Sequence, residues 1–543
     1  MGEPGENSTA LNPFRYSREA IAAAFLFLAS AGVVVWQASR LTVLWDVSYV
    51  LENASRMAGG DVPYRDFPFP YPPLTFAMQA LIIRLFGHVY WHATFYAAIV
   101  CGVGSVLAHA VVRRLVAPKI SLVLCAPLAL LGIYCIFPHP FYDPDACLAV
   151  LVALLVLLID DDNPWAGALV VVPLLVKQNI GFAFFAAVAV VALFERRWRL
   201  LSGMLLAAAA AAGAISVLFG WTNYIRWTIH YAAARRMPPL REVLSIYREW
   251  TVWWSAIALV AGCCWLRWSS RHRWAGVLLM VWPWLWILFR FLVTDDPVEP
   301  QINLLRLWPI VMVSTVMTVA LSWRSGPPSS RLVPLAMLGA IHGAFLSQST
   351  WGSTYGIWPL AVILIGLLFH FSRAPLIAAV LIAAITIHSG FGYVLANDRL
   401  SYVQWRDGEM NRSDLPELQG MRMRGPWLPQ FDELVHFTDR VIPRGDGILC
   451  LPGEDLFYFA TGRQPRSAVL MFDGTVNPLA PAEIASMAER RGLRWVIVKR
   501  RLQIEGNPYP EMAAMLQTLG ERYGLVAKLT GYDVYALRGR RSH

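Results

Sequence analysis

The sequence predicts a polytopic α-helical membrane protein with a small α/β domain at its C-terminal end. The first observation is composition: of 543 residues, 57% are hydrophobic and 15% are charged, whereas soluble proteins carry about 25% charged residues. The second is that apolar stretches long enough to cross a bilayer as a helix, about 20 residues, recur as far as Ala396. A soluble enzyme, a disulfide-rich secreted scaffold and a disordered chain are therefore excluded.

The first part of the chain is predicted to form one membrane helix followed by a long outer loop. Two arginines precede Ala20–Ser39, and the positive-inside rule places them in the cytoplasm. Basic residues also follow Trp91–Val112, which puts the end of that helix on the same side. The two groups of basic residues can lie on the same side only if the short run Leu74–Phe86 does not cross the membrane. Residues 40–90 are therefore expected to lie outside, with helices on the membrane surface.

The remaining apolar runs bring the predicted total to about thirteen transmembrane helices. The further segments are Ile120–Phe137, Ala146–Ile159, Trp165–Val176, Gly181–Phe194, Leu200–Phe219, Thr251–Trp268, Ala275–Val293, Leu305–Trp323, Leu332–Thr350, Gly356–Phe371 and Pro375–Ala396. Because thirteen is odd, the C-terminal part is expected on the outer face, opposite a cytoplasmic N-terminus. The predicted division is a membrane domain over 1–396 and an extracytoplasmic α/β domain over 397–543.

The C-terminal domain is predicted from a change to ordinary soluble composition. Two helices are expected to open at proline, which needs no backbone donor in the first turn. The expected helices are Pro481–Arg491 and Pro510–Tyr523, and the expected strands are Gly447–Leu451, Leu493–Lys499, Gly524–Leu529 and Tyr532–Leu537.

The first outer loop holds the leading candidate for chemistry. Asp46 follows the first helix in an apolar setting, where a carboxylate is costly unless it is used or paired. The loop continues through 59–74, rich in Gly, Pro and aromatic residues, with Arg65 and Asp66 inside it. The aromatic side chains are expected at headgroup level. A structural interpretation remains open, in which Asp46 caps a surface helix and Arg65 pairs locally with Asp66.

Further candidates lie at the outer ends of predicted spans. Asp143 and Asp145 have the spacing of carboxylates that hold a divalent cation such as Mg²⁺ or Mn²⁺, although helix capping by Asp145 fits equally. Lys177 and Arg306 are basic residues on the outer face, against the positive-inside bias. An anionic headgroup or a carrier phosphate would explain them, and plain snorkelling to the interface is the alternative.

Asp46 after the first helix, the segment Gly59-Gly60-Asp61-Val62-Pro63-Tyr64-Arg65-Asp66-Phe67 and the run Pro72-Pro73-Leu74 resemble the GT-C glycosyltransferases. Bacterial enzymes similar to the lipid A aminoarabinose transferase and the protein O-mannosyltransferases are the relatives implied. The resemblance implies a polyprenyl-phosphate-linked sugar donor, with Asp46 at the acceptor and Lys177 and Arg306 at the carrier phosphate. Many members have Asp-Glu at the catalytic position, whereas Val47 follows Asp46 here.

The function implied is glycosyl transfer to a lipid, glycan or protein acceptor on the outer face of the plasma (inner) membrane. Asp46 would act as general base in a direct, inverting displacement, and Arg65 and Asp66 join Lys177 and Arg306 as candidate substrate-binding residues. Membrane lipids are expected partners. Nucleic-acid binding is not expected, because the basic residues of this +10 chain are spread over its loops. A transporter or lipid flippase is the alternative, but its charges should occur in the middle of spans.

Overall fold

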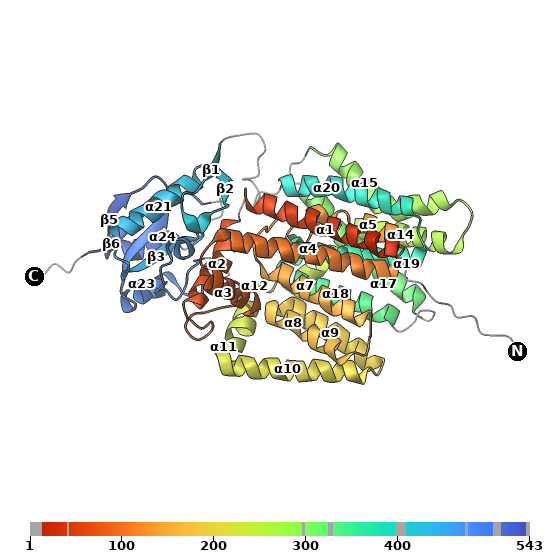
Figure 1. The fold of residues 1–543 in the computed structure, drawn as a ribbon, viewed down its shortest axis with the longest axis horizontal. Helices are drawn as coiled ribbons and strands as arrows, with labels where there is room; N and C mark the ends of the chain where they lie inside the picture. The colour runs from red at the N-terminus through yellow and green to blue at the C-terminus, as the bar shows by residue number, and fades with distance from the viewer. Residues whose placement is uncertain are drawn as a thin grey trace, which may run out of the picture.

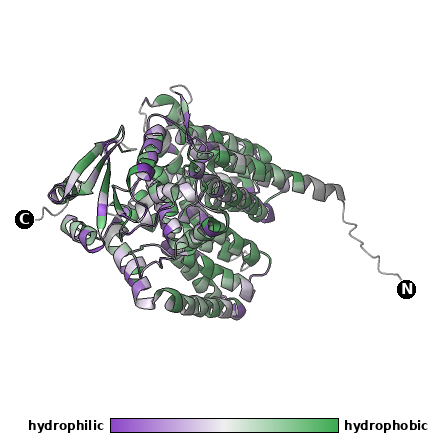
Figure 2. Ribbon diagram, turned by 60° about the vertical axis from the view of Figure 1, so that its left-hand side comes forward, coloured by the Kyte–Doolittle hydropathy of each residue, from purple (hydrophilic) through white to green (hydrophobic). Residues whose placement is uncertain are grey.

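Long helices run side by side through most of the chain, and a small α/β unit lies at one end of them (Figure 1). This computed structural model describes residues 13–40, 43–295, 299–323, 329–396, 409–472, 476–502 and 512–538. Apolar residues dominate the helical part, whereas polar residues gather toward the end that carries the α/β unit (Figure 2). The arrangement agrees with a membrane-embedded bundle.

Helices occupy all but one of the predicted membrane segments. They are α1 (Pro13–Ala38), α4 (Tyr90–Leu115), α7 (Tyr142–Leu157), α8 (Pro164–Val176), α9 (Gln178–Phe194), α10 (Trp198–Phe219), α14 (Trp250–Trp268), α15 (Arg273–Val293), α17 (Leu307–Ser322), α18 (Ser329–Ser353), α19 (Trp358–Ser372) and α20 (Leu376–Ala396). In the described ranges, six helices are long and apolar enough to cross a membrane, or seven if the bent pair Leu240–Tyr247 and Trp250–Trp268 is one span. The count of thirteen spans stays a prediction.

The prediction of one helix over Ile120–Phe137 is wrong. The segment contains two short helices, α5 (Pro118–Cys125) and α6 (Leu128–Leu131), and its remainder is irregular. Pro127 lies at the break, where it offers no backbone N–H to continue the helix. The irregular stretch that follows α6 is buried in the bundle.

Two helices form in the predicted outer loop: α2 (Leu44–Ala58) and α3 (Leu74–Phe86). The bounds of α3 are those predicted. Leu85 and Phe86 expose 65% and 64% of their surface, which suits a helix that lies against lipid. Shorter elements complete the region after α10 and before α17: α11 (Trp221–Ile225), the π-helix η1 (Arg226–Tyr231), α12 (Ala232–Arg236), α13 (Leu240–Val243), η2 (Leu244–Tyr247) and α16 (Glu299–Leu305).

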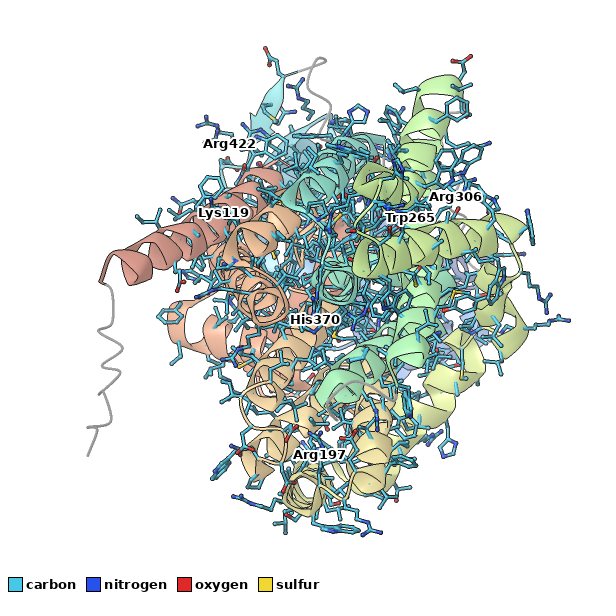
Figure 3. All side chains as sticks on the ribbon, turned by 90° about the vertical axis from the view of Figure 1, so that its right-hand side faces the viewer. Lys119, Arg197, Trp265, Arg306, His370 and Arg422 are labelled. Atoms are coloured by element: carbon cyan, nitrogen blue, oxygen red, sulfur yellow. The ribbon has the colours of Figure 1, made fainter. Side chains whose placement is uncertain are left out.

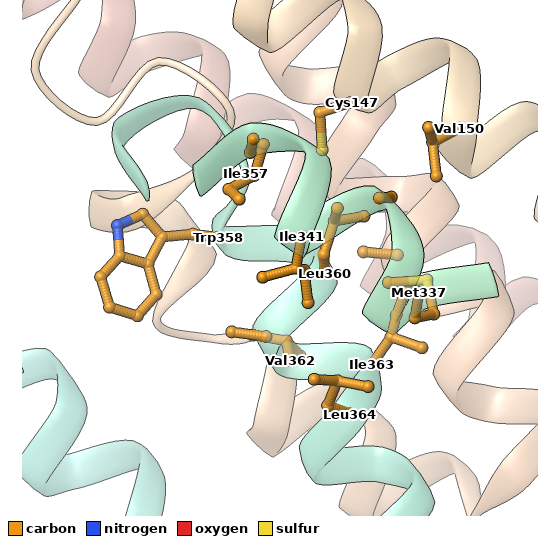
Figure 4. Close-up of a cluster of buried hydrophobic side chains, with 14 of the residues drawn as sticks. Cys147, Val150, Met337, Ile341, Ile357, Trp358, Leu360, Val362, Ile363 and Leu364 are labelled. Carbon is orange, nitrogen blue, oxygen red and sulfur yellow. The ribbon is translucent and has the colours of Figure 1, made fainter. Parts of the chain in front are cut away.

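The bundle is held by close side-chain packing. Lipid tails are as apolar as leucine, so packing stabilises helix contacts here more than removal from water does. Met337 and Ile341 of α18 belong to one buried cluster with Leu360 and Ile363 of α19 (Figure 4). Elsewhere α8 and α10 approach so closely that a Cβ on Gly203 would collide with the backbone of Pro164.

The C-terminal unit is a four-stranded mixed sheet with helices. The strand order is β3-β4-β6-β5, with β3 and β4 parallel and the other pairs antiparallel. Its elements are β1 (Met410–Arg412), η5 (Pro416–Leu418), β2 (Arg422–Arg424), α21 (Trp427–Val441), β3 (Gly447–Leu451), α22 (Phe457–Thr461), α23 (Pro481–Arg490), β4 (Leu493–Lys499), α24 (Met512–Gly520), β5 (Tyr523–Lys528) and β6 (Tyr532–Leu537).

All four predicted strands are confirmed, with β5 beginning one residue early, whereas α21 was not predicted. The predicted boundary at 396/397 adjoins 397–408, outside the described residues. The division of the chain into two domains therefore stays a prediction.

Candidate active site

A buried ion pair lies at the turn between α8 and α9. Lys177 is the single residue between those helices and has an extended backbone. Its Nζ donates to Oδ1 of Asp143, in the first turn of α7, at 2.5 Å. Both residues are at least 95% buried. Removing one partner of such a pair leaves an uncompensated buried charge.

Asp46 approaches this pair from a third element. It lies half-buried in the first turn of α2, where the helix dipole favours a negative charge. Asp46 is close enough to Lys177 for the two charges to interact. The structure thus brings together two carboxylates and one ammonium group predicted from separate parts of the sequence.

Aromatic side chains surround the ion pair. Nζ of Lys177 lies 4.7 Å from the ring centre of Tyr142, a favourable cation–π distance. Tyr142 stacks on Tyr71 with ring centres 4.1 Å apart and donates to its hydroxyl at 2.8 Å. Tyr64 donates to the carbonyl of Tyr71 at 2.6 Å. These loop aromatics are buried inside the protein and are not spread along its surface.

A large apolar cavity adjoins Lys177. Its volume is about 490 Å³, and its walls come from α8, α9, α10 and η1. Leu174, Phe182 and Ile215 line it, and Lys177 and Gln178 are among the few polar groups on its wall. The Gln178 side-chain amide donates to the carbonyls of Pro70 and Thr228 at 3.1 and 3.0 Å. That amide ties the loop before α3 to the π-helix, so it fixes one wall of the cavity.

Asp143 and Asp145, the predicted cation ligands, have separate partners in the structure, and a shared cation site stays a prediction. Residues two apart on a helix point to different sides: Asp143 pairs with Lys177, whereas Asp145 accepts three hydroxyl hydrogen bonds. Its donors are Thr75, Tyr134 and Tyr96, at 2.7, 2.9 and 2.9 Å. Across the described ranges, no group of three or more His, Cys, Asp or Glu is placed to hold a metal ion.

The other predicted binding residues lie elsewhere. Arg65 and Asp66 pair with each other at 2.9 Å, as the structural interpretation expects, and neither lines the cavity. Arg306 donates to Asn303 at 2.8 Å and is likewise not a lining residue. In a view along the bundle, Arg306 lies toward the upper right and Arg197 toward the lower end (Figure 3). A substrate-binding role for these three residues stays a prediction.

Sequence reasoning missed the tyrosines of the site. Tyr142 lies next to Asp143 and could have been inferred from that position. Tyr96 and Tyr134 carry no comparable signal, because Tyr96 lies within an apolar helix and Tyr134 within a segment predicted to be a span. Only the fold brings their hydroxyls to Asp145.

Comparison with known proteins adds one family match. Residues 70–221 match the family model described as dolichyl-phosphate-mannose-protein mannosyltransferase. The matched part contains Asp143 and Lys177 but neither Asp46 nor Arg306. No curated protein sequence matches the chain.

Solved structures that align with a TM-score of 0.50 or more share the fold. The apo oligosaccharyltransferase of Archaeoglobus fulgidus aligns with a TM-score of 0.51 at 12% identity, covering 98% of this chain and 76% of that chain. The same organism's AglB, in complex with an inhibitory peptide and a dolichol-phosphate, aligns with a TM-score of 0.50 at 12% identity. The alignment covers 98% of this chain and 75% of that chain. ArnT from Cupriavidus metallidurans, bound to undecaprenyl phosphate, aligns with a TM-score of 0.48 at 13% identity. The alignment covers 98% of this chain and 99% of that chain.

Proposed function

We propose that this chain, which has the fold of the GT-C superfamily of membrane glycosyltransferases, moves a sugar from a polyprenyl-phosphate-linked donor to an acceptor on the outer face of the plasma membrane. One observation carries the proposal: the apolar cavity of about 490 Å³ has the buried ammonium group of Lys177 on its wall. A long apolar chain that ends in a phosphate matches this combination of surfaces. The AglB structure, which contains a dolichol-phosphate, supports the same class of ligand.

The donor phosphate would bind at Lys177. Asp143 neutralises that ammonium group when no ligand is present, so the charge is held in place before the donor arrives. An incoming phosphate would share Lys177 with Asp143 and gain a charge-assisted hydrogen bond. The isoprenoid tail would lie along α8, α9 and α10.

The transfer step would use Asp46 as general base. The acceptor hydroxyl gives its proton to the Asp46 carboxylate while its oxygen forms a bond to the anomeric carbon. The bond from that carbon to the phosphate oxygen breaks, and Lys177 stabilises the charge that develops on the leaving phosphate. Direct displacement inverts the anomeric centre. The acceptor class, which the sequence leaves as a lipid, glycan or protein, is set by the surface around Asp46.

Lipid binding tests the proposal directly. Purified protein would be titrated with undecaprenyl phosphate and, as a matched control, with undecaprenol, which has the same tail but no phosphate. We expect thermal stabilisation by the phosphate lipid alone. We also expect Lys177→Met to lose that stabilisation, whether or not Asp143→Asn is added to remove the unpaired carboxylate. Equal responses to the two lipids would contradict a phosphate site.

A further inference from the structure

A buried contact joins α2, the helix that carries Asp46, to the C-terminal unit. Three polar residues of α2, Ser48, Glu52 and Arg56, follow one another at four-residue spacing, so they form one stripe along the helix. Each exposes 3% or less of its surface. The stripe faces the segment 453–468 of the C-terminal unit, about 400 residues away in the chain.

Every residue of the stripe is bonded to main chain of the C-terminal unit. The Ser48 hydroxyl lies 3.0 and 2.9 Å from the carbonyl oxygens of Gly453 and Asp455. The Glu52 carboxyl accepts from the backbone N–H groups of Tyr458 and Phe459 at 3.1 and 3.0 Å.

Arg56, at the far end of the stripe, donates to the carbonyl of Ala468 at 3.0 Å and also to Asp61 at 2.5 Å. Because main-chain groups move less than side chains do, these hydrogen bonds fix the position of α2 more tightly than bonds to mobile side chains would. The stripe therefore fixes both the position of α2 along its axis and its rotation about that axis.

The receiving segment is itself rigidly held. The Asp455 carboxylate accepts from Lys499 at 2.7 Å, from Trp427 at 2.6 Å and from Tyr532 at 3.0 Å. Lys499 also pairs with Glu454 at 2.5 Å. Since α21, β4 and β6 supply these donors, the sheet of the C-terminal unit is coupled directly to the loop that contacts Ser48.

Apolar packing locks the same contact. Leu44, Val47 and Leu51 of α2 belong to one buried cluster with Leu456 and Phe457 of the C-terminal unit. Residues on an α-helix advance by about 100° each, so Asp46 lies about 160° around α2 from Ser48. Asp46 therefore faces away from the C-terminal unit, toward Lys177, and any rotation of α2 on its anchors displaces the Asp46 carboxylate.

We propose that the C-terminal unit positions Asp46 for catalysis by holding α2 through Ser48, Glu52 and Arg56. This inference rests on the proposed function, because it takes Asp46 as the base. The three anchors are positioning residues: none of them lines the apolar cavity beside Lys177. The α/β unit thus contributes to catalysis by holding α2 in place, whichever acceptor the enzyme uses.

A double-mutant cycle tests positioning against general loss of structure. The single variants are Glu52→Ala and Asp46→Asn, and the third is their combination. Turnover would be followed as undecaprenyl phosphate released from a panel of undecaprenyl-phosphate-linked hexoses and pentoses, in native membranes whose lipids, glycans and proteins supply the acceptor. We expect Glu52→Ala to lower kcat about 10–100-fold, since small misplacements of catalytic groups have effects of that size. In the Asp46→Asn background, Glu52→Ala should lower it no further, because the misplaced base is already absent.

Matched measurements separate the outcomes. Binding of undecaprenyl phosphate should be unchanged in Glu52→Ala, because the Lys177 cavity is intact. Glu489→Ala, an exposed acidic residue of the same unit that pairs with Arg522, should leave kcat unchanged. Glu52→Gln, which keeps one acceptor oxygen, should recover part of the activity.

Two results would overturn the inference. In the first, the double variant loses kcat by the product of the two single losses, so the effects of Glu52→Ala and Asp46→Asn are independent. In the second, the fall in kcat of Glu52→Ala is fully explained by a smaller fraction of folded protein. Full turnover by Asp46→Asn would instead defeat the proposed base itself, and with it the premise of this inference.

Discussion

Lys177 and Asp143 form a buried ion pair in which Nζ and Oδ1 are 2.5 Å apart, although the two residues lie 34 positions apart in the chain. The pair joins the first turn of α7 to the α8–α9 turn, beside the apolar cavity. A buried lysine without a counter-charge would be costly. Asp143 therefore keeps a cation in the site that we propose receives the donor phosphate.

Lys177→Met should destabilise the fold by about 3–5 kcal/mol, because Asp143 is left buried and unpaired. Adding Asp143→Asn should recover most of that loss, since two neutral groups then face each other. Thermal unfolding of the two variants in one detergent measures the difference. A double variant as unstable as the single one would show that the ion pair does not set the stability here.

Asp145 should act through its three hydroxyl donors. Tyr134→Phe removes one of them and should destabilise the fold by about 1–2 kcal/mol. If Asp145 held a cation, removal of divalent ions with a chelator would reproduce the loss, and added Mg²⁺ or Mn²⁺ would reverse it. We expect neither effect on the unfolding temperature of the wild type or of Tyr134→Phe.

Local sequence patterns predict most helices and strands of this fold because each follows from the chemistry of neighbouring residues. The prediction of one helix over Ile120–Phe137 was wrong because hydropathy cannot distinguish an apolar helix from a buried apolar segment without regular secondary structure. Pro127 was the available signal. The strands β3, β4 and β6 were predicted with their observed bounds, because their apolar runs are short and well separated.

The candidate site was predictable only in part. Asp46 and Lys177 stand out locally, as charges in apolar surroundings at predicted span ends. The pairing of Asp143 with Lys177, and of Glu52 with the backbone of Tyr458, depends on tertiary contacts across 34 and 406 residues. No local pattern reports such contacts, so Tyr96, Tyr134 and the α2 anchors could not be found from the sequence.

The contact between α2 and the C-terminal unit should weaken as pH rises. Burial raises the pKa of Glu52 to about 8, helped by the charge of Asp455 and opposed by two backbone N–H donors. Between about pH 5 and pH 8 the folded state then binds a proton that the unfolded state has lost, so stability falls across this window. Unfolding temperatures at pH 5 and pH 8 measure the slope, which Glu52→Gln should reduce.

His88 provides the control for that experiment. It lies beside Ser55 and Phe459, and burial lowers its pKa. A lowered histidine pKa gives stability that is lost as pH falls, which is the opposite sign to Glu52. His88→Gln should therefore steepen the fall between pH 5 and pH 8. A slope that Glu52→Gln leaves unchanged would assign the effect to other groups.

Topology predicts that residues 60 and 115 face opposite sides of the membrane. Gly60 follows α2 in the loop predicted to lie outside, and Leu115 ends α4 beside two arginines. Single cysteines introduced at these positions, in a chain whose native cysteines are replaced, would be labelled with a membrane-impermeant reagent in intact cells. We expect labelling at 60 alone. Equal labelling at both positions would show that α3 crosses the membrane.

Asp46→Asn is the decisive test of the chemistry. Asparagine keeps the shape of the side chain but cannot accept the acceptor proton, and general-base contributions are typically 10²–10⁴-fold. Turnover should fall by about that factor, while undecaprenyl phosphate still binds because Lys177 and the cavity are unchanged. Folding should survive, since a half-buried charge is replaced by a neutral group of equal size. Turnover compared among variants of equal unfolding temperature isolates the proton transfer, and near-normal turnover would require another base.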